Sequence, residues 1–285
     1  MSAYYQLAKP GIIYGNALTA AAGFLLASSI AGSFEAWLFV ALLLGTSLVI
    51  ACGCVINNYL DRPLDKRMAR TKRRASVTGA VPTRSAMLYA VILGIAGFAI
   101  LASYTNALTV GVGVTGLFFY LVMYSVGKRR SVWGTVVGSV SGATPILASY
   151  TAVTNRLDAG GVILFLIMVL WQMPHFYAIA LYRFEDYKNA GLPVLPVVKG
   201  VRIAKLQIIA YIIAFALAII ALTAAGYTGY LYLLIMLPLS FWWLVTGLKS
   251  FNTPDSKQWG RTMFLASLKV VLVLSVMTAL GALLP

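Results

Sequence analysis

Long apolar runs separated by short polar segments dominate the pattern of this chain. Each run is close to the roughly 20 apolar residues that a helix needs to cross a bilayer. Because lipid offers no partner to an unpaired backbone group, the runs predict helices and not open sheets. We therefore expect an all-α polytopic membrane protein that forms one transmembrane domain over residues 1–285. The nine predicted spans are 11–30, 37–58, 84–103, 107–126, 132–151, 159–180, 206–226, 228–247 and 263–284.

Composition supports this class and excludes others. Of the 285 residues, 61% are apolar and only 10% are charged, against about 25% charged in a soluble domain. The 22 Lys and Arg against 7 Asp and Glu give a net charge of +15. In a membrane protein such an excess reflects loop asymmetry, so a nucleic-acid partner is not expected. Two cysteines and one histidine leave no disulfide framework and no multi-histidine metal site.

The basic residues also orient the spans. All of them except Arg156 lie in the N-terminal segment or around the connections after spans 2, 4, 6 and 8. By the positive-inside rule, the basic side of this multi-pass protein is cytoplasmic, and we expect the membrane to be the bacterial cytoplasmic (inner) membrane. Its N-terminus is expected in the cytoplasm and its C-terminus on the periplasmic side.

The longest polar connection, 57–84, begins with a row of oxygen ligands. Asn57, Asp61 and Asp65 are spaced four residues apart, which places them on one face of a helix. Such a row suits Mg²⁺, which takes one or two carboxylates and completes its shell with water and phosphate. The alternative is a helix end whose acids pair with neighbouring basic residues. Pro63 interrupts the row and favours a new helical turn there.

Basic side chains accompany the acids in three connections. Arg70 and Arg74 follow the acidic row, Lys128 and Arg129 end span 4, and Arg183 follows span 6. Beside a metal–carboxylate row, they would clamp the oxygens of a pyrophosphate. Alone, each group is equally well explained as a positive-inside anchor.

His175, the single histidine, lies in the segment Trp171-Gln172-Met173-Pro174-His175-Phe176. It is either a polar residue satisfied within the helical core, or a group that contacts a porphyrin through its iron or a propionate, or a proton-transfer residue. Nearby rings are more often packing residues, although they would also stabilise a carbocation.

Several segments together carry a resemblance to a known family. The chain resembles the protohaem IX farnesyltransferases, a branch of the UbiA-type intramembrane prenyltransferase superfamily, over nearly its whole length. The segments are Lys9-Pro10-Gly11-Ile12, the Asn57/Asp61/Asp65 row, Arg70-Thr71-x-x-Arg74, Trp171 to Phe176, Tyr182-Arg183-Phe184-x-Asp186-Tyr187, and Leu192 to Gly200.

This resemblance implies a fold and a site. The fold would be nine helices around a central cavity that opens to the cytoplasm, with the 2–3 and 6–7 loops closing its mouth. Asn57 and the metal ligands Asp61, Asp65 and Asp186 would form the catalytic Mg-pyrophosphate site. The superfamily's second motif is usually D-x-x-x-D, but Ala190 stands four residues after Asp186. Glu185 is a candidate to complete that second set of ligands.

The implied reaction transfers a farnesyl group from farnesyl diphosphate to the 2-vinyl group of haem B, giving haem O and pyrophosphate. Mg²⁺ would be the cofactor and haem B a substrate, with His175 as the haem contact. Haem A synthase or a terminal oxidase would be the protein partners. The expected pyrophosphate ligands are Arg70, Arg74, Lys128, Arg129 and Arg183.

Three alternatives remain at this point. Within the same chemistry, the acceptor would be an aromatic quinone precursor, which the haem-branch segments disfavour. From another class, the chain would be a transporter of an anionic metabolite, with the basic loops as its binding funnel. A bare assembly factor for an oxidase would leave the acidic row unexplained.

Overall fold

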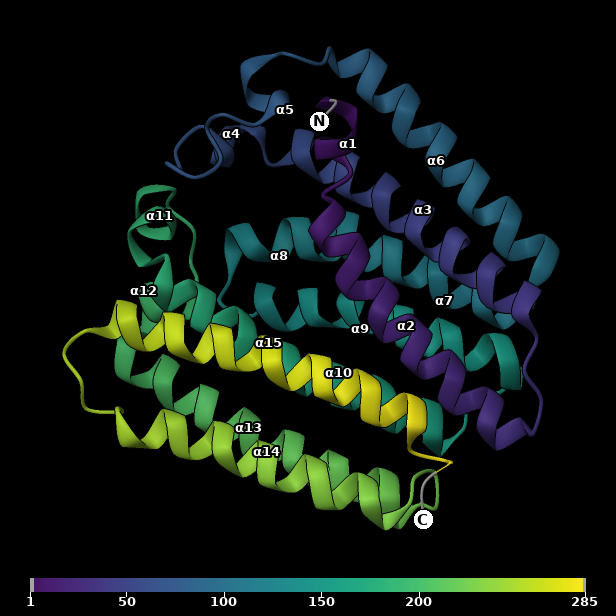
Figure 1. Ribbon diagram of the computed structural model, residues 1–285. Coiled ribbons are helices and arrows are strands. Elements are labelled where there is room, and N and C mark those ends of the chain that lie inside the picture. Colours follow the sequence, from purple (N-terminus) through teal and green to yellow (C-terminus); the bar gives the residue numbers. More distant parts are fainter. Residues whose placement is uncertain (1–2, 284–285) are drawn as a thin grey trace.

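The computed structural model describes residues 3–283, and every regular element within that range is a helix (Figure 1). Nine of these helical segments are long and apolar enough to cross a bilayer, which confirms the predicted all-α integral membrane protein. They are α2 (Pro10–Ala31), α3 (Ala36–Leu60), α6 (Thr83–Tyr104), the continuous segment Ala107–Arg130, α9 (Gly134–Thr154), α10 (Ala159–Tyr182), α13 (Val201–Ala224), α14 (Tyr230–Lys249) and α15 (Ser256–Leu280).

The segment Ala107–Arg130 is not a uniform α-helix. It consists of α7 (Ala107–Phe118), the π-helical turn η1 (Phe119–Tyr124) and α8 (Ser125–Arg130). Short helices occupy the connections: α1 (Ala3–Leu7), α4 (Arg62–Asp65), α5 (Ala75–Thr78), α11 (Phe184–Asn189) and α12 (Leu195–Lys199).

Two helices begin earlier than the predicted spans, whose starts were placed at 206 and 263. The seventh starts at Val201 and the ninth at Ser256, because each opens with a polar turn that an apolar pattern does not register. In α15 the side chain of Asp255 caps the helix by accepting the backbone N–H of Gln258, and Trp259 is already fully buried. Pro174 does not break its span, since α10 runs continuously through it.

Helix α10 lies at the centre of one half of the molecule, where it packs against α9, α13 and α15. Helix α2 joins the two halves by packing on α3, α9 and α15. Some of these contacts depend on glycine. A Cβ at Gly260 of α15 would lie 2.8 Å from the backbone oxygen of Ala178 in α10, so the two backbones approach too closely for a larger residue.

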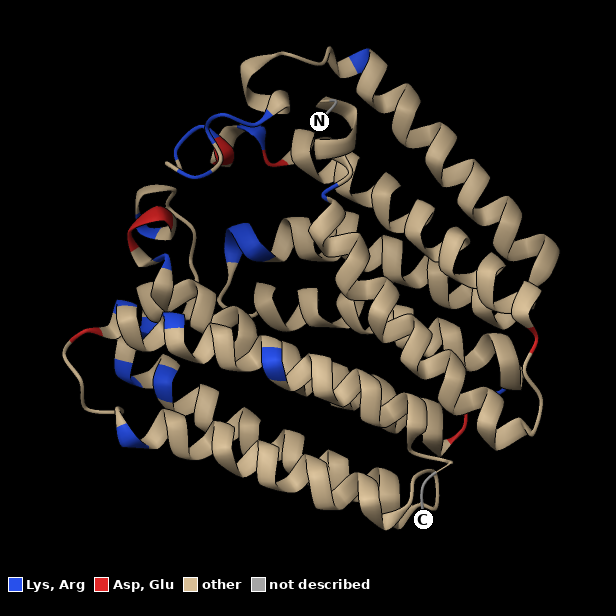
Figure 2. Ribbon diagram, in the orientation of Figure 1, with Lys and Arg blue, Asp and Glu red and all other residues tan. Residues whose placement is uncertain are grey.

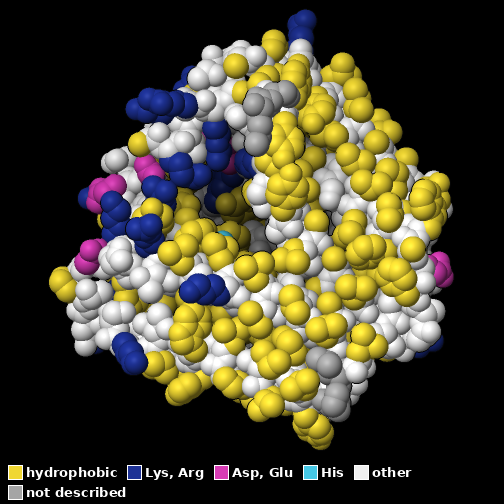
Figure 3. All heavy atoms as spheres, viewed as in Figure 1, with side chains coloured by type: hydrophobic (Ala, Val, Ile, Leu, Met, Phe, Trp, Pro, Cys, Tyr) yellow, Lys and Arg dark blue, Asp and Glu magenta, His cyan; other side chains and the backbone are white. Residues whose placement is uncertain are grey.

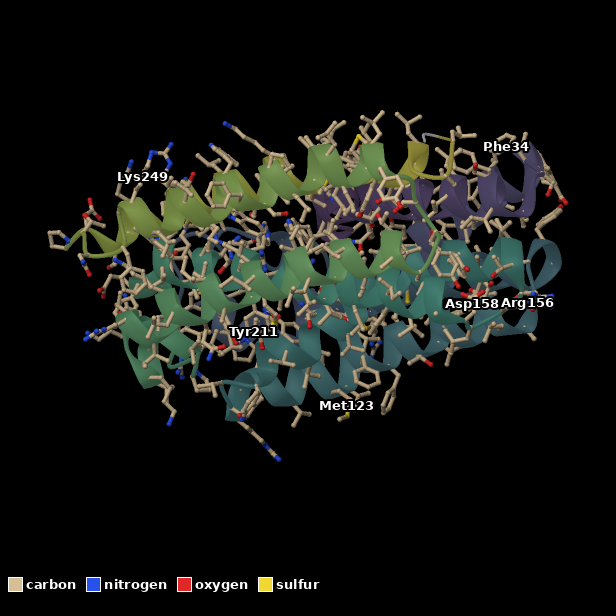
Figure 4. The ribbon with its side chains drawn as sticks, turned by 90° about the horizontal axis from the view of Figure 1, so that it is seen from below. Phe34, Met123, Arg156, Asp158, Tyr211 and Lys249 are labelled. Atoms are coloured by element: carbon tan, nitrogen blue, oxygen red, sulfur yellow. The ribbon has the colours of Figure 1, made fainter. Side chains whose placement is uncertain are left out.

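Charge is concentrated at one end of the bundle. Figure 2 shows Lys and Arg gathered around the short connecting helices, at one end of the long ones. Seen from below, Lys249 lies at that end, whereas Arg156 and Asp158 lie at the opposite end (Figure 4). The candidate residues from the 2–3, 4–5 and 6–7 connections therefore share one side of the predicted membrane.

The connection between the second and third spans (α3 to α6, the 2–3 loop) contacts the connection between the sixth and seventh spans (α10 to α13, the 6–7 loop). The backbone N–H of Ala69 donates to Oδ1 of Asp186 at 3.3 Å. An apolar cluster of Met68, Ala190 and Leu192 joins the same two loops, with Tyr187 packed against it. Beside these loops the space-filling surface is hollowed, and basic side chains border the hollow (Figure 3).

Candidate active site at the basic end

The acidic row follows a nearly continuous helical path. Asn57 lies in the last turn of α3, Asp61 joins α3 to α4, and Asp65 ends α4. The backbone N–H of Asp61 donates to the oxygen of Asn57 at 2.9 Å, and that of Asp65 donates to Asp61 at 2.8 Å. Pro63 sits in the first turn of α4, where its missing N–H costs no hydrogen bond. The helical hydrogen bonds between residues four apart are therefore kept on both sides of Pro63.

Lys128 connects this row to α8. Its Nζ donates to Oδ1 of Asn57 at 3.1 Å and to Oδ2 of Asp61 at 2.6 Å. Asn57 in turn donates to the same Oδ2 of Asp61 at 2.9 Å. The side chains of Lys128 and Asp61 are only 11% and 14% exposed, so this charge pair is shielded from bulk water.

The π-helical turn η1 comes just before Lys128. Tyr120 and Tyr124 stack with centroids 6.0 Å apart, and the ring of Tyr124 lies 4.6 Å below the Lys128 ammonium. A π-turn changes the angular position of every residue that follows it, and such turns occur often at functional sites. Here the turn and the aromatic support set the direction in which Lys128 points.

Two arginines complete the ion pairs of the row. Nη1 of Arg74 lies 2.8 Å from Oδ2 of Asp65, whose side chain is 4% exposed. Arg129 donates to the backbone oxygen of Leu60 and lies 3.5 Å from Oδ1 of Asp61. Of the four arginines named from the sequence, Arg74 and Arg129 therefore reach the acidic row, and so does Lys128.

The remaining predicted residues gather around α11. Asp186 is half-buried and faces the 2–3 loop, whereas Glu185 is exposed. The Arg183 guanidinium lies over the ring of Tyr182, 4.3 Å from its centroid. The pKa of Tyr187 is raised, chiefly by burial and also by the charge of Asp186, although the nearby arginines Arg70, Arg183 and Arg74 act to lower it.

Ala190 has a structural explanation. It is 2% exposed and packs in the apolar cluster that joins the two loops. A carboxylate in its place would be buried without a partner, which is costly. The residue where the superfamily usually carries its last acid is thus used here for packing between the loops.

The carboxylates fit Mg²⁺ by type but are not assembled around one point. Asn57, Asp61 and Asp65 offer the hard oxygen donors that this ion prefers. Among residues 3–283, however, no group of three or more His, Cys, Asp or Glu side chains is close enough to hold a metal ion. Asp186 belongs to no such group with the row, and basic side chains engage both carboxylate oxygens of Asp61 and one of Asp65.

Lys9 was not among the residues expected at the site, although its surroundings place it there. Its backbone adopts the left-handed conformation, with φ 54°, and it directly precedes α2. Burial lowers the pKa of Lys9; the charges of Arg74 and Lys128 lower it further, whereas Asp61 raises it. Lys9, Asn58 and Arg74 also line a small pocket. The signal in the sequence was its place in Lys9-Pro10-Gly11-Ile12, one of the segments that carry the family resemblance.

His175 lies away from the acidic row, on α10. Its Nδ1 is 2.8 Å from Oγ of Ser267 in α15, and its ring stacks on Trp171 with centroids 4.9 Å apart. The ring centroid of Phe264, in α15, lies 5.2 Å from that of the imidazole. The structure therefore separates a charged group at the bundle end from an aromatic group around His175.

Helices, an acidic row and surrounding cations are features of an intramembrane prenyltransferase, and comparison with known proteins supports that class. The model of the UbiA prenyltransferase family matches residues 16–268. The chain therefore belongs to this family, which confirms the resemblance found in the sequence.

Individual relatives agree with this assignment. Protoheme IX farnesyltransferase 2 of Chromobacterium violaceum is 50% identical over 278 residues, which cover 97% of this chain and 91% of that protein. Protoheme IX farnesyltransferase of Serratia proteamaculans is 49% identical over 97% of this chain and 93% of its own length.

Solved structures show the same fold at low identity. A digeranylgeranylglyceryl phosphate synthase matches with a TM-score of 0.78 and 17% identity, over 98% of this chain and 97% of its own. A UbiA homologue from Archaeoglobus fulgidus bound to DMAPP and Mg²⁺ matches with a TM-score of 0.69 and 16% identity, over 95% and 100%.

Proposed function

We propose that this protein transfers a farnesyl group from farnesyl diphosphate to the 2-vinyl group of haem B, giving haem O and pyrophosphate. The observation that carries this proposal is the near 50% identity, over almost the whole chain, to relatives named protoheme IX farnesyltransferase. Family membership favours an enzyme over the transporter considered from the sequence.

The arrangement of the site suits a reaction between two apolar substrates with one charged leaving group. A fifteen-carbon chain and a porphyrin would occupy the hollow, and the diphosphate would lie at the basic end (Figures 2 and 3). Lys128, Arg129, Arg70, Arg74 and Arg183 would offset the negative charge that develops on the leaving group.

The bond changes then follow. The C–O bond of farnesyl diphosphate breaks and both electrons leave with pyrophosphate. The allylic cation is attacked by the vinyl group, which forms a C–C bond and leaves a cation beside the porphyrin. Water adds to that cation and loses a proton, which supplies the hydroxyl group of haem O. The apolar walls must exclude bulk water until this last step.

Mg²⁺ would be held by Asp61, Asp65 and Asp186, with Asn57 beside them. When bound, it would neutralise charge on the diphosphate. A solved relative of the same fold contains Mg²⁺ with a prenyl diphosphate, which supports this assignment. The hydrogen bond from Ala69 to Asp186 joins the loop that follows Asp65 to the loop that carries Asp186.

We further propose that residues 1–285 form one transmembrane domain in the bacterial inner membrane, with the basic end and the N-terminus cytoplasmic and the C-terminus periplasmic. The distribution of basic residues supports this orientation. Haem O would then pass to haem A synthase or to a haem-copper oxidase.

Purified protein in nanodiscs, given haem B and farnesyl diphosphate with Mg²⁺ or with a chelator, tests the function. Mass spectrometry should find haem B increased by one farnesyl group and one hydroxyl group, only when Mg²⁺ is present. Addition of 4-hydroxybenzoate should yield no prenylated product. Absence of the haem adduct, or preferential prenylation of the benzoate, would overturn the proposal.

A further inference from the structure

The hydrogen bonds around His175 determine which of its ring nitrogens carries the proton. Oγ of Ser267 lies 2.6 Å from the backbone oxygen of Phe264 and 2.8 Å from Nδ1 of His175. A carbonyl has no proton to give, so the single hydroxyl proton of Ser267 must lie toward Phe264. The hydroxyl oxygen therefore accepts from His175, and Nδ1 is the protonated nitrogen.

The other nitrogen, Nε2, then carries a lone pair. Apolar rings of Trp171, Phe176 and Phe264 surround the imidazole, and none of the ion pairs of residues 3–283 includes it, so the ring is neutral. Among the hydrogen bonds of the described chain, Nε2 takes part in none. The lone pair is thus unused.

The same serine also fixes the orientation of the ring. The indole N–H of Trp171 donates to the backbone oxygen of Ser267 at 2.9 Å, and the indole stacks on the imidazole at an interplanar angle of 25°. Both side chains of α10 are therefore attached to one buried residue of α15. A ligand histidine needs this kind of support, because a second hydrogen bond sets both its tautomer and its direction.

The imidazole is accessible as well as ordered. His175 is half-buried, although Trp171 and Ser267 beside it are buried. Figure 3, in which histidine is cyan, shows a small cyan surface inside the hollow, and the chain has one histidine. The imidazole therefore borders the space in which a flat apolar substrate would fit.

We infer that Nε2 of His175 is an axial ligand of the haem iron and that Ser267 is the positioning residue that keeps Nε2 unprotonated. This inference rests on the proposed function, because it takes haem as the substrate. It also decides between the two porphyrin contacts left open by the sequence. A propionate would need an N–H donor, but the N–H at Nδ1 is already used by Ser267. Ligation would hold the macrocycle, and with it the reacting vinyl group, at one position.

Binding spectra test the ligation without any turnover. Purified protein is titrated with haem B and with metal-free protoporphyrin IX, and absorbance and magnetic circular dichroism are recorded. We expect a histidine-ligated iron spectrum, and tighter binding of haem B than of the metal-free porphyrin. His175→Ala should lose that spectrum and bind both porphyrins alike, and added imidazole should restore it. An unchanged iron spectrum in a folded His175→Ala protein would overturn the inference.

Ser267 has a matched control on the same helix. Ser275 is also buried, and its hydroxyl donates to the backbone oxygen of Val271 without contact to the histidine. Ser267→Ala should weaken haem B binding by about 10-fold or more, with the affinity for metal-free porphyrin unchanged. Ser267→Thr should restore haem binding, and Ser275→Ala should leave it unaltered. Equal effects of both alanine variants would overturn the role of Ser267.

These measurements also separate the inference from the proposed function. If the wild-type protein produces haem O but His175→Ala keeps the same iron spectrum, only the ligation fails. If the wild-type protein neither binds haem B nor converts it, the proposed function fails, and the inference fails with it.

Discussion

Nζ of Lys128 lies 2.6 Å from Oδ2 of Asp61, although 67 positions separate the two residues in the chain. The contact attaches the fourth span to the acidic row at the end of the second. It also brings a cation and a candidate metal ligand into one shielded group, together with Asn57. This group is the part of the site on which the proposed chemistry depends most.

Replacing Lys128 tests whether the pair takes part in the reaction. Lys128→Ala should lower the rate of haem O formation by about 100-fold, since it removes a positioned cation from the leaving group. Arg130→Ala is the control, because Arg130 is exposed beside Lys128 and outside the contacts described for the site. Steady-state product formation by mass spectrometry gives both rates. Equal rates for the two variants would show that Lys128 takes no part in the reaction.

Asp61→Asn tests the metal assignment. The variant keeps the shape of the side chain but loses the charge that would hold Mg²⁺, so product formation should fall below detection. Glu35→Gln, which changes an exposed acid in another connection, should retain normal turnover. Thermal unfolding is recorded for both variants. Near-normal activity of folded Asp61→Asn across a Mg²⁺ titration would contradict the assignment.

Ala190→Asp restores the acid that the superfamily usually has at this position. We expect a lower Tm and no gain in Mg²⁺ affinity, because the new carboxylate would be buried among Met68 and Leu192. Asn189→Asp adds the same charge at an exposed neighbouring position and should leave the Tm unchanged. If Ala190→Asp were fully stable and bound Mg²⁺ more tightly, packing would not explain the alanine.

The close approach of α10 and α15 predicts different effects for two glycine substitutions. Gly260→Ala should destabilise the protein by about 1–3 kcal/mol, because the added methyl group meets backbone atoms of the facing helix. Gly15→Ala should be neutral or slightly stabilising, since a Cβ there meets nothing within 4 Å and alanine favours helix. Thermal unfolding in detergent compares them. Since α10 and α15 also carry His175 and Ser267, Gly260→Ala should weaken haem binding too.

Labelling of single cysteines tests the membrane orientation. Arg156→Cys and Lys257→Cys place thiols at exposed positions at opposite ends of the bundle, whereas the native Cys52 and Cys54 are buried. A membrane-impermeant maleimide added to spheroplasts should label Arg156→Cys and not Lys257→Cys. Inverted vesicles should give the opposite result. The same side for both thiols would contradict the positive-inside orientation.

Much of the fold could be predicted because lipid restricts what a chain can do. A run of about 20 apolar residues has few stable conformations besides a membrane-crossing helix, and all nine spans occur in the predicted order. Errors are confined to the ends, such as Ser256, where a polar cap and not hydropathy decides where the helix begins. The residues of the π-turn at 119–124 are as apolar as those of the neighbouring α-helix, so the sequence pattern did not predict the turn.

The acidic row could also be predicted, since Asn57, Asp61 and Asp65 are close in sequence and a helix fixes their spacing. The residues that other spans contribute to the two sites could not be predicted. Ser267 lies 92 residues from His175, and a serine in an apolar helix carries no sign of its neighbour. Lys9 and Tyr187 reach the site only through the packing of α2 and of the two loops.

The sequence by itself therefore determined the class, the spans, the local acidic row and the family, because each depends on short-range periodicity or on residues close in the chain. Only the tertiary structure decided that Lys128 joins Asp61, that Ala190 packs between two loops and that His175 presents Nε2. Those features depend on which faces of distant helices meet, and in lipid that is settled by close packing and hydrogen bonding between helices, which a hydropathy pattern does not encode.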